Sequence, residues 1–497
     1  MLPSKRRRTN WLYFVKKNAK DLDKLIPRLK GFKSLVVIDD EADYATPNAK
    51  VNKNNKKTTI NQLVEKLVGP SGCYVGVTAT PARLDLNNTL KNRTDKWVNF
   101  EPHAEYNGKD DFFPIGSKGV YRQTLLTQPA TKKDAKDALI RFLVTVAFLN
   151  TDAGRRVENY TMLIHTSGKT EDHQADKVAI EECIFALKSD GKEFEEIVTQ
   201  LLEVSRKLYP DSDVELLTSY VVRNASSAKL VVLNSKRDRS LGGETAVEPP
   251  SPFTIIIGGN IVSRGVTFKN LLSMFFTRSV KNKLQQDTYI QRARMFGVRK
   301  YLPHFELTIP AILFGDWHKC FLFHRLALAT IFNDALASPI WVGDRRVSIV
   351  SPSSVDHATV AMGNSEMGYT VFNFTDECDL IVERDRTSVA TLQALRVVTG
   401  PGALPQSLVA LISKMQEYFP GTLAIHRASP IAGYGRTADQ ETVFRAKGFM
   451  GNPQLELAAF PRAIHHIKIF YNAKRRARVI YKFTGDLMLA QNQRQMI

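Results

Sequence analysis

Two short stretches near the start of the chain carry residues that could act on a phosphate. Residues 35–43 read LVVIDDEAD, an apolar run that predicts a buried strand ending in clustered carboxylates. At such a strand end the backbone is fixed and water is limited, so Asp40 can hold Mg²⁺ and Glu41 can orient or deprotonate a water. Residues 75–81 read VGVTATP, which predicts a second short strand ending in a polar turn. The alternative is a solvated acidic turn, and the TAT turn one strand later weakens it.

A second group of polar residues follows an apolar run in the middle of the chain. Residues 253–259 read FTIIIGG, a β-branched run typical of a buried strand, and they continue into NIVSRGVTF at 260–268. Residues 287–299 read DTYIQRARMFGVR. A guanidinium suits phosphate binding because its planar fork stays charged and binds oxygens bidentately. The alternative is an amphipathic surface helix whose arginines are only solvated.

These four stretches resemble motifs II, III, V and VI of a superfamily 2 helicase core, the first containing the Walker B carboxylates. The resemblance implies ATP and Mg²⁺ as cofactors on a P-loop NTPase fold. It implies that Glu41, Gln291, Arg294 and Arg299 act in catalysis, with the two arginines reaching the γ-phosphate. The nucleotide and its metal would be contacted by Asp40, Asp43, Gly265 and Asp287. Coupling to nucleic acid would fall to Thr78, Thr80, Arg264 and Thr267.

The amino-acid sequences of these motifs are similar to those of one family in particular, the Z1 domain proteins. That family is found with bacterial and phage-related restriction and defence genes and carries a proposed endonuclease function. The resemblance covers roughly residues 10–330 and includes MLIHTS at 162–167. Two departures stand out: Ala293 replaces a Gly that is usual in the family, and the spacing from Gln291 to the arginines differs by one residue from generic motif VI. Which arginine contacts the γ-phosphate therefore stays open.

A helicase-like lobe also needs a phosphate loop, whose backbone amides cradle the phosphates and whose Lys neutralises them. No G-x-x-x-x-G-K-[ST] pattern occurs in this sequence, and the SGKT at 167–170 lacks the first Gly, since position 163 is Leu. We therefore expect either a truncated or split gene product, whose phosphate loop lies on an upstream segment or a partner polypeptide, or a degenerate paralogue. Alone, the chain is expected to bind ATP poorly.

Composition and charge favour a nucleic-acid-binding protein of a reducing compartment. The net charge is +19, and residues 1–33 and 462–497 carry +9 and +7 of it, which would attract polyanions. Four scattered cysteines argue against a zinc site or a disulfide framework and for the cytoplasm. The sequence holds no apolar run of about 18 residues, so we expect no membrane partner. Expected partners are nucleic acid, with DNA favoured over RNA, and restriction or methylation subunits.

One basic cluster lies between two predicted strands near the C-terminus. Lys474, Arg475 and Arg476 follow the apolar residues 467–471 and precede 479–483. A hairpin with arginines beside aromatic side chains could contact a nucleic-acid backbone. A solvated turn is the equally ordinary alternative.

The predicted fold class is α/β: two RecA-like lobes with parallel sheets, the first incomplete, followed by a C-terminal α+β region. We expect the first lobe at 1–130 and the second at 131–329, with a helical insertion at 171–222. Residues 330–497 form a basic domain of unknown role. A restriction-type nuclease would need an Asp and a Glu-x-Lys on adjacent strands, and Asp379 with Glu383 does not supply them.

Three functions remain open. The first is a helicase-like, nucleic-acid-dependent ATPase or translocase subunit of a restriction or defence system that is inactive for ATP hydrolysis by itself. The second is a non-catalytic DNA-binding scaffold, and the third is a nuclease that uses the C-terminal region.

Overall fold

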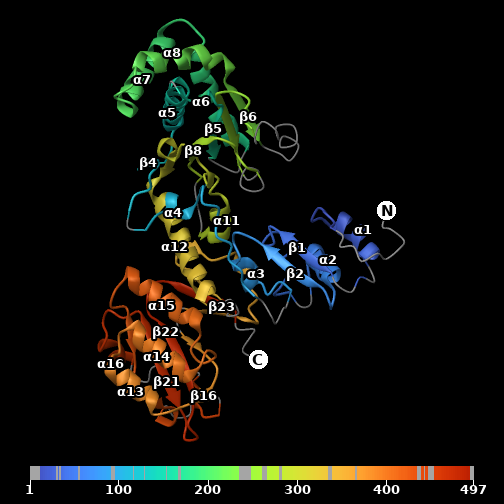
Figure 1. Cartoon of the computed structure of the whole chain (residues 1–497), viewed down its shortest axis with the longest axis vertical. Coiled ribbons are helices and arrows are strands. Elements are labelled where there is room, and N and C mark those ends of the chain that lie inside the picture. The colour runs from blue at the N-terminus through green and yellow to red at the C-terminus, as the bar shows by residue number, and fades with distance from the viewer. Residues whose placement is uncertain are drawn as a thin grey trace. The chain divides into compact units, whose positions relative to one another are not determined.

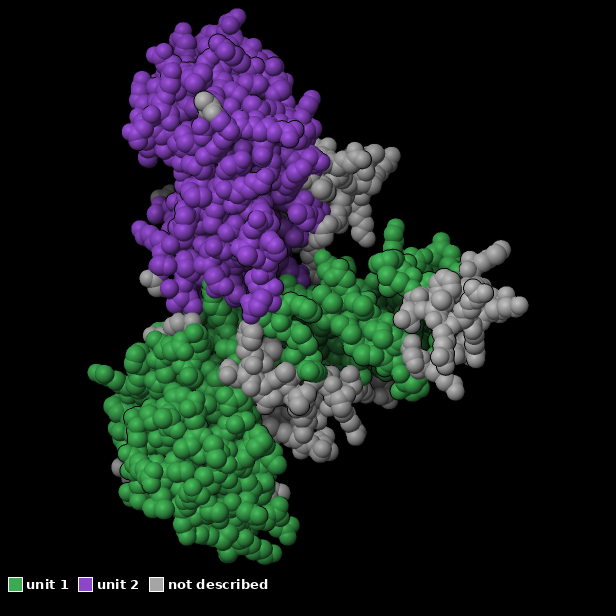
Figure 2. Space-filling view, viewed as in Figure 1, with its two compact units in different colours: residues 1–100, 285–287, 322–497 green, residues 101–284, 288–321 purple. Residues whose placement is uncertain are grey.

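The structure is a computed structural model, and it describes residues 12–29, 32, 35–53, 56–90, 96–115, 117–127, 129–152, 154–165, 170–233, 248–259, 266–278, 283–333, 339–363, 366–433, 438–441, 443–445 and 453–492 (Figure 1). The chain divides into two compact units (Figure 2). Unit 1 comprises residues 1–100, 285–287 and 322–497, and unit 2 comprises 101–284 and 288–321. The units therefore interleave along the sequence, whereas the predicted domains do not.

Unit 1 begins with a small parallel sheet that carries the acidic turn. Strands β1 (Val36–Asp40) and β2 (Cys73–Val77) pair in parallel. Helices α1 (Ala19–Leu29) and α2 (Thr59–Val68) pack on each other, and Tyr74 of β2 packs against their shared core. The described residues 12–15 form no strand, and α1 follows them.

The other face of this sheet is apolar and exposed. Side chains alternate between the faces of a strand, and the register places Val36, Ile38, Val75 and Val77 on one face. Their exposed fractions are 60%, 65%, 42% and 44%. Parallel sheets are almost always covered on both faces, so among the described residues this sheet lacks the cover that its composition calls for.

Unit 2 is built on a six-stranded sheet in which every neighbouring pair is parallel. Its strand order is β4-β11-β8-β5-β7-β6. The bounds are β4 (Arg122–Leu126), β5 (Tyr160–His165), β6 (Lys229–Leu233), β7 (Phe253–Gly258), β8 (Leu271–Phe276) and β11 (Glu306–Pro310). The central strands β5, β7 and β8 are buried at every position, as their β-branched and aromatic composition predicts.

Helices of unit 2 cover this sheet and form the expected insertion. Helix α5 (Lys132–Thr151) begins with a capping box in which Thr131 and Asp134 exchange hydrogen bonds. The insertion consists of α6 (Thr170–Ala186), α7 (Lys192–Leu208) and α8 (Val214–Asn224). The remaining elements that lie in unit 2 or reach into it are β3 (Tyr106–Asn107), α4 (Lys109–Phe112), η1 (Ala225–Ser227), β9 (Leu284–Gln285), α11 (Gln286–Gln291), β10 (Gly297–Val298), η3 (Leu302–His304) and α12 (Ala311–Asn333).

The C-terminal part of unit 1 is mainly antiparallel. One three-stranded sheet has the order β12-β23-β14, and a second sheet runs β15-β22-β21-β17 with β16 and β18 attached. The strands are β12 (Ile340–Gly343), β13 (Val347–Ser348), β14 (Val360–Gly363), β15 (Glu366–Gly368), β16 (Phe372–Asn373), β17 (Leu423–Ile425), β18 (Ser429–Pro430), β19 (Ala438–Asp439), β20 (Phe444–Arg445), β21 (His465–Tyr471), β22 (Arg476–Phe483) and β23 (Met488–Asn492). The helices are η4 (Pro352–Ser354), α13 (Glu377–Arg384), α14 (Val389–Thr399), α15 (Gln406–Tyr418) and α16 (Pro453–Ala458).

The segment after β2 joins the acidic region to this C-terminal part. Helix α3 (Ala82–Leu86) contributes Ala82 and Leu86 to a core that also contains Trp341. The buried Trp341 indole donates to a carboxylate oxygen of Asp85 over 2.8 Å, and Asn492 donates to the Asp85 carbonyl over 2.7 Å. These bonds explain why residues 1–100 group with 322–497. The predicted fold class, α/β with parallel sheets and a C-terminal α+β region, is confirmed.

Candidate functional site

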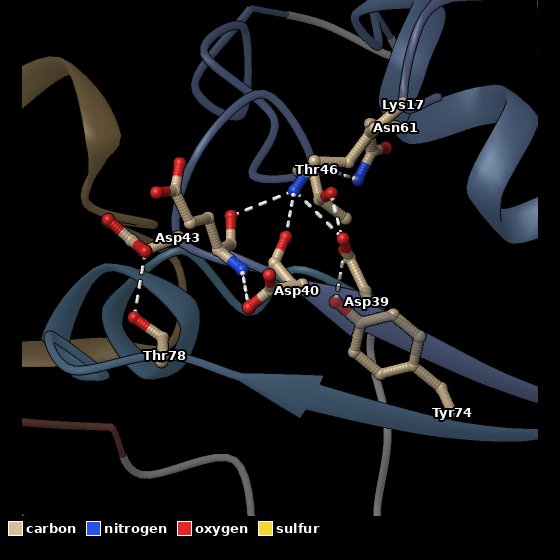
Figure 3. Close-up of polar contacts among 9 residues, drawn as sticks. Lys17, Asp39, Asp40, Asp43, Thr46, Asn61, Tyr74 and Thr78 are labelled. Atoms are coloured by element: carbon tan, nitrogen blue, oxygen red, sulfur yellow. Dashed lines mark hydrogen bonds and ion pairs between the residues drawn. The ribbon is translucent and has the colours of Figure 1, made fainter. Parts of the chain in front are cut away.

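The acidic turn after β1 is organised around Asp39 (Figure 3). The Asp39 side chain is nearly buried, with 7% exposed. Its Oδ2 accepts from the hydroxyls of Thr46 over 2.6 Å and Tyr74 over 2.8 Å, and its Oδ1 accepts from Lys17 Nζ over 2.8 Å. Burial first, and then the Asp39 carboxylate, raises the pKa of the Tyr74 hydroxyl, which therefore stays a donor. Asp39 is thus the anchor that fixes the turn.

Lys17 fastens the same turn from the segment before α1. Besides Asp39, its ammonium donates to the carbonyl of Asp40 over 2.9 Å and to that of Glu41 over 2.8 Å. An ammonium has three donors, and all three are used here. This arrangement brings a cation within hydrogen-bond range of the strand end that carries the candidate catalytic carboxylates.

Asp40 and Glu41 lie at the exposed end of the turn, where a ligand could reach them. Both side chains are exposed, and the Glu41 amide donates to Asp40 Oδ1 over 2.9 Å. Glu41 has φ = 48°, in the left-handed region, which costs a non-glycine residue on the order of 1 kcal/mol or more. Such strain is typical of functional turns. Here the bonds from Lys17 to the carbonyls of Asp40 and Glu41 stabilise the strained backbone.

Asp43 has a different place from the one that the sequence suggested. Its side chain is 1% exposed. It accepts from the Thr78 hydroxyl over 2.7 Å and from the Thr80 hydroxyl over 3.1 Å. Asp43 therefore links the acidic turn after β1 to the TAT turn after β2 through two side-chain hydrogen bonds.

Asp287 and Gln291, both on α11, lie in different surroundings. The Asp287 carboxylate is fully buried and forms an ion pair with Arg83 of α3 at 2.9 Å. Arg83 neutralises the charge that the sequence assigned to nucleotide binding, so the geometry gives Asp287 a structural partner. Gln291 is half-buried at the end of the helix.

Arg299 is held by the backbone of its own turn. Its guanidinium donates to the carbonyls of Met295 over 2.7 Å, Arg294 over 3.0 Å and Phe296 over 3.2 Å. Burial lowers the pKa of Arg299 to about 10. These bonds use donors that a γ-phosphate would need, and Arg294 and Arg299 are both half-buried.

Arg264 and Gly265, which the sequence predicted to contact nucleic acid and nucleotide, lie outside the described residues. Thr267 is described and exposed, directly before the buried Phe268. Neighbouring Arg292 is 8% exposed, with its guanidinium 4.7 Å from the centroid of the Tyr289 ring. The sequence did not single out Arg292.

The C-terminal basic cluster forms the turn between β21 and β22, the predicted hairpin. Lys474, Arg475 and Arg476 are exposed. Arg475 pairs with Asp376 and lies over the Phe374 ring at 5.1 Å, so it is partly neutralised. The aromatic residues Phe470 and Tyr481 of the two strands are 2% and 1% exposed, so they serve the core and are closed to nucleic acid.

The two carboxylates weighed for a restriction-type nuclease lie on one helix of the C-terminal region. Asp379 and Glu383 both belong to α13, with Asp379 accepting from the Ala428 amide and Glu383 pairing with Arg427. Within the part of the chain that the structure describes, no three His, Cys, Asp or Glu side chains lie close enough to hold a metal ion. Mg²⁺ bound with a nucleotide needs only one or two carboxylates, and the exposed Asp40 fits that requirement.

Sequence reasoning missed three residues of the acidic turn: Lys17, Thr46 and Tyr74. Each lies outside the IDDEAD run, and only folding brings it to Asp39. The one available signal was the alternation on β2, which places Tyr74 on the same face as Asp39.

Comparison with known proteins supports part of the resemblance. Residues 134–315 match the sequence model of the Z1 domain. This range contains MLIHTS and the arginine-containing residues 287–299, whereas the IDDEAD and TAT turns lie outside it. No curated protein matches the chain. Among the helices of the described residues, none has the length and apolar character that crossing a membrane requires.

Several solved structures share limited similarity with the chain. S. cerevisiae Dbp5 bound to RNA and ADP BeF3 has a TM-score of 0.28 and 10% identity, over 58% of this chain and 56% of that one. A variant of the same complex gives 0.29 and 11%. The ATP-dependent Type ISP restriction-modification enzyme LlaBIII bound to DNA gives 0.27 and 12%, over 67% of this chain and 23% of that one. The chain therefore spans about half of Dbp5 and under a quarter of the restriction enzyme.

Proposed function

We propose that the chain is a helicase-like, nucleic-acid-dependent ATPase or translocase subunit whose acidic half-site is the turn after β1. The observation that carries the proposal is the pair of bonds from Thr78 and Thr80 to Asp43. They make the turns after two neighbouring parallel strands move as one body. A change at the carboxylates would then reach the TAT turn directly, as a nucleotide-driven motor requires.

The acidic turn supplies distinct groups for binding and for chemistry. Asp40 would hold Mg²⁺, which neutralises phosphate charge and polarises the γ-phosphoryl oxygens when it is bound. Glu41, exposed beside it, would accept a proton from the attacking water or orient it. Lys17 keeps both peptide units of this turn in place through their carbonyls.

The second half-site would come from unit 2. Arg294 or Arg299 would contact the γ-phosphate, with the Arg299 guanidinium also donating to backbone carbonyls. Gln291 would assist it, and Arg264, Gly265 and Thr267 would contact nucleotide or nucleic acid.

The nucleic-acid partner is proposed to be DNA, in the cytoplasm, with restriction or methylation subunits as further partners of a defence system. The basic hairpin supports a phosphate contact, since Lys474 and Arg476 are exposed there.

A phosphate loop is proposed to come from another polypeptide segment that docks on the exposed apolar face of the β1–β2 sheet. The four exposed side chains of that face form an apolar surface of the kind that marks an interaction site. A segment that packs there would lie against the sheet whose carboxyl end presents Asp40 and Glu41.

The test is DNA-stimulated ATPase activity of the chain with and without a separate polypeptide that supplies a phosphate loop. We expect activity only with that polypeptide and a loss of at least about 100-fold in Glu41→Gln, the range for removing a general base. Glu105→Gln, at an exposed site in unit 2, is the matched control. A Glu41→Gln complex as active as its parent contradicts the assignment.

The second candidate function is a DNA-binding scaffold without turnover, favoured by the exposed cations of the hairpin. Salt-dependent DNA binding that ATP does not change, together with no ATPase activity in the extended complex, would support it over the motor.

A further inference from the structure

His165 ends the central strand β5 of unit 2 and is completely buried, with 0% exposed. Neither ring nitrogen has a hydrogen-bond partner among the described residues. A buried donor or acceptor without a partner costs roughly 1–3 kcal/mol, and such groups in native proteins call for an explanation. His165 thus carries two polar atoms without protein partners in the described core of unit 2.

Aromatic contacts connect His165 to Arg292, the residue that follows α11. Its ring packs edge-on against Phe276, the last residue of β8, at 4.9 Å between centroids. Phe276 packs in turn against Tyr289 at 6.3 Å, and the Tyr289 ring lies under the Arg292 guanidinium at 4.7 Å. Trp317 fixes Tyr289 by donating to its carbonyl over 2.9 Å. A continuous series of side-chain contacts therefore leads from His165 through Phe276 and Tyr289 to Arg292.

The groups whose charges act on His165 are cationic. Burial first, and then Arg292, Arg278, His173 and Arg294, hold the pKa of His165 well below its usual range. The ring is therefore neutral, with one N–H donor and one acceptor nitrogen. Arg278 lies two residues beyond the end of β8, and α6 begins five residues after His165. Carboxyl ends of parallel strands and helix N-termini are where anions bind in α/β sheets.

We infer that His165 is a ligand-contact residue that donates its N–H to a phosphoryl oxygen at the carboxyl end of β5, beside Arg292 and Arg278. The phosphoryl group is the terminal one of a nucleoside triphosphate, an identity that rests on the proposed function. An oxyanion accepts the N–H of the neutral ring, and its negative charge favours the nearby guanidinium groups. The alternative is a packing histidine whose polar atoms are tolerated.

The two roles differ in what an apolar replacement does. His165→Phe keeps a ring against Phe276 and removes both nitrogens, so a packing role predicts unchanged anion binding. A ligand-contact role predicts lower anion affinity at unchanged stability. His165→Gln retains an N–H donor and is expected to keep part of the affinity, and it also serves if the phenylalanine is too large for the site.

The matched control is His304→Phe. His304 lies directly before β11, at the opposite end of the same sheet, where it bonds to Tyr209 and packs on Phe148. Burial, together with Arg122 and Arg155, likewise lowers the pKa of His304, to about 4. Both histidines thus have a lowered pKa, but His304 lies at the amino end of the sheet and His165 at its carboxyl end.

The experiment measures binding of pyrophosphate and ATP to the full chain by calorimetry and by the rise in Tm. We expect binding in the parent, about tenfold weaker affinity in His165→Phe, an intermediate value in His165→Gln, and parental affinity in His304→Phe. The tenfold decrease corresponds to one charge-assisted hydrogen bond. Equal pyrophosphate affinity in parent and His165→Phe, or no pyrophosphate binding by the parent, overturns the inference.

Two further arms separate this inference from the proposed function. A failed ATPase test, together with pyrophosphate binding that His165→Phe weakens, contradicts the proposed function and leaves the His165 site standing. If ATPase activity depends on Glu41 but His165→Phe keeps full ATP affinity, the inference about His165 is wrong and the proposed function stands. If His165→Phe weakens single-stranded DNA binding alone, the anion is a backbone phosphate and the nucleotide assignment is wrong.

Discussion

Lys17 shows how one side chain can hold the acidic turn through its hydrogen bonds. It uses all three donors on the acidic turn, bonding one carboxylate and two carbonyls. The Glu41 backbone, at φ = 48°, depends on those bonds. At the residue scale the candidate site therefore rests on Asp39, Lys17 and Tyr74 as much as on the carboxylates that face solvent.

Replacing Lys17 should damage both the fold and the site. Lys17→Met leaves the nearly buried Asp39 without its cation, at a cost of about 2 kcal/mol. We expect a lower free energy of unfolding for the β1–β2 region, measured by hydrogen exchange. Lys16→Met, at the exposed neighbouring position, is the control and should match the parent. Equal protection in the two variants would show that the Lys17 bonds contribute nothing.

The link between the two turns should appear as an energetic coupling. Asp43→Ala and Thr78→Val each remove one side of the 2.7 Å bond. Because both groups are shielded from water, we expect a coupling free energy of about 1–2 kcal/mol in a double-mutant cycle of unfolding. Additive effects would remove the observation that carries the proposed motor. In the complex with the phosphate-loop polypeptide, Thr78→Val should uncouple DNA stimulation from basal ATPase activity.

At the element scale, two features set the properties of unit 1. The β1–β2 sheet presents one apolar face to solvent, whereas the C-terminal sheet buries histidines. His426 Nε2 lies 3.1 Å from His466 Nδ1, and His465 bonds to the Tyr481 hydroxyl over 2.8 Å. Burial, with neighbouring cations such as Lys468 and Lys482, lowers the pKa of His426 to about 3 and of His466 to about 4.

These histidines make the C-terminal region sensitive to acid. Their usual pKa is about 6.5 in the unfolded chain, so below that pH the unfolded state binds more protons than the folded state. Stability is therefore present above about pH 6.5 and falls as the pH drops toward the folded-state values of about 4 and about 3. We expect a decrease of about 1.4 kcal/mol per pH unit per histidine, measured by urea unfolding at pH 7 and pH 5.5. His426→Gln should make the slope shallower, and an unchanged slope would contradict this origin.

The exposed sheet face should tolerate polar residues better than a core would. Val36→Thr with Ile38→Thr changes side chains that are 60% and 65% exposed, so the Tm of the chain should change by only a few degrees. The same pair should weaken association with the phosphate-loop polypeptide, measured by co-purification. Leu63→Thr, at a site 5% exposed on the covered side, should instead lower the Tm strongly. Unaltered association in the Val36/Ile38 variant would place the docking surface elsewhere.

For the whole molecule, the decisive feature is charge. The sequence carries +19, with much of it at the two ends. Such a charge produces strong, salt-dependent attraction to polyanions without specifying which groups touch them. The described exposed cations of the β21–β22 turn are the best-defined part of that surface.

DNA affinity should therefore fall steeply with salt and depend on the hairpin. Removing one phosphate-binding cation makes the slope of log K against log salt shallower by about 0.9. We expect Lys474→Gln with Arg476→Gln to reduce the slope by about 1–2, measured by fluorescence anisotropy. Lys192→Gln, on the exposed side of α7, controls for a general change in charge. An equal reduction in both variants would show that net charge alone acts.

The sequence alone predicted the buried strand at 253–259 and the helical insertion at 171–222 of unit 2, because both signals are local. The apolar run at 253–258 is β7, and 271–276 is β8, as their composition predicts. It also placed the acidic and TAT turns at the ends of neighbouring strands, since parallel pairing follows from two apolar runs joined by a helix.

Only the tertiary structure decided which polar group does what. Asp43, Asp287 and Arg299 look alike in sequence to the groups that bind a ligand, yet Thr78, Arg83 and backbone carbonyls occupy them. Lys17 and His165 gave no such signal, and folding brought the first to the acidic turn and buried the second at the end of β5. The physical reason is that a run of residues fixes hydrophobic burial locally, whereas hydrogen-bond partners come from segments far apart in the chain.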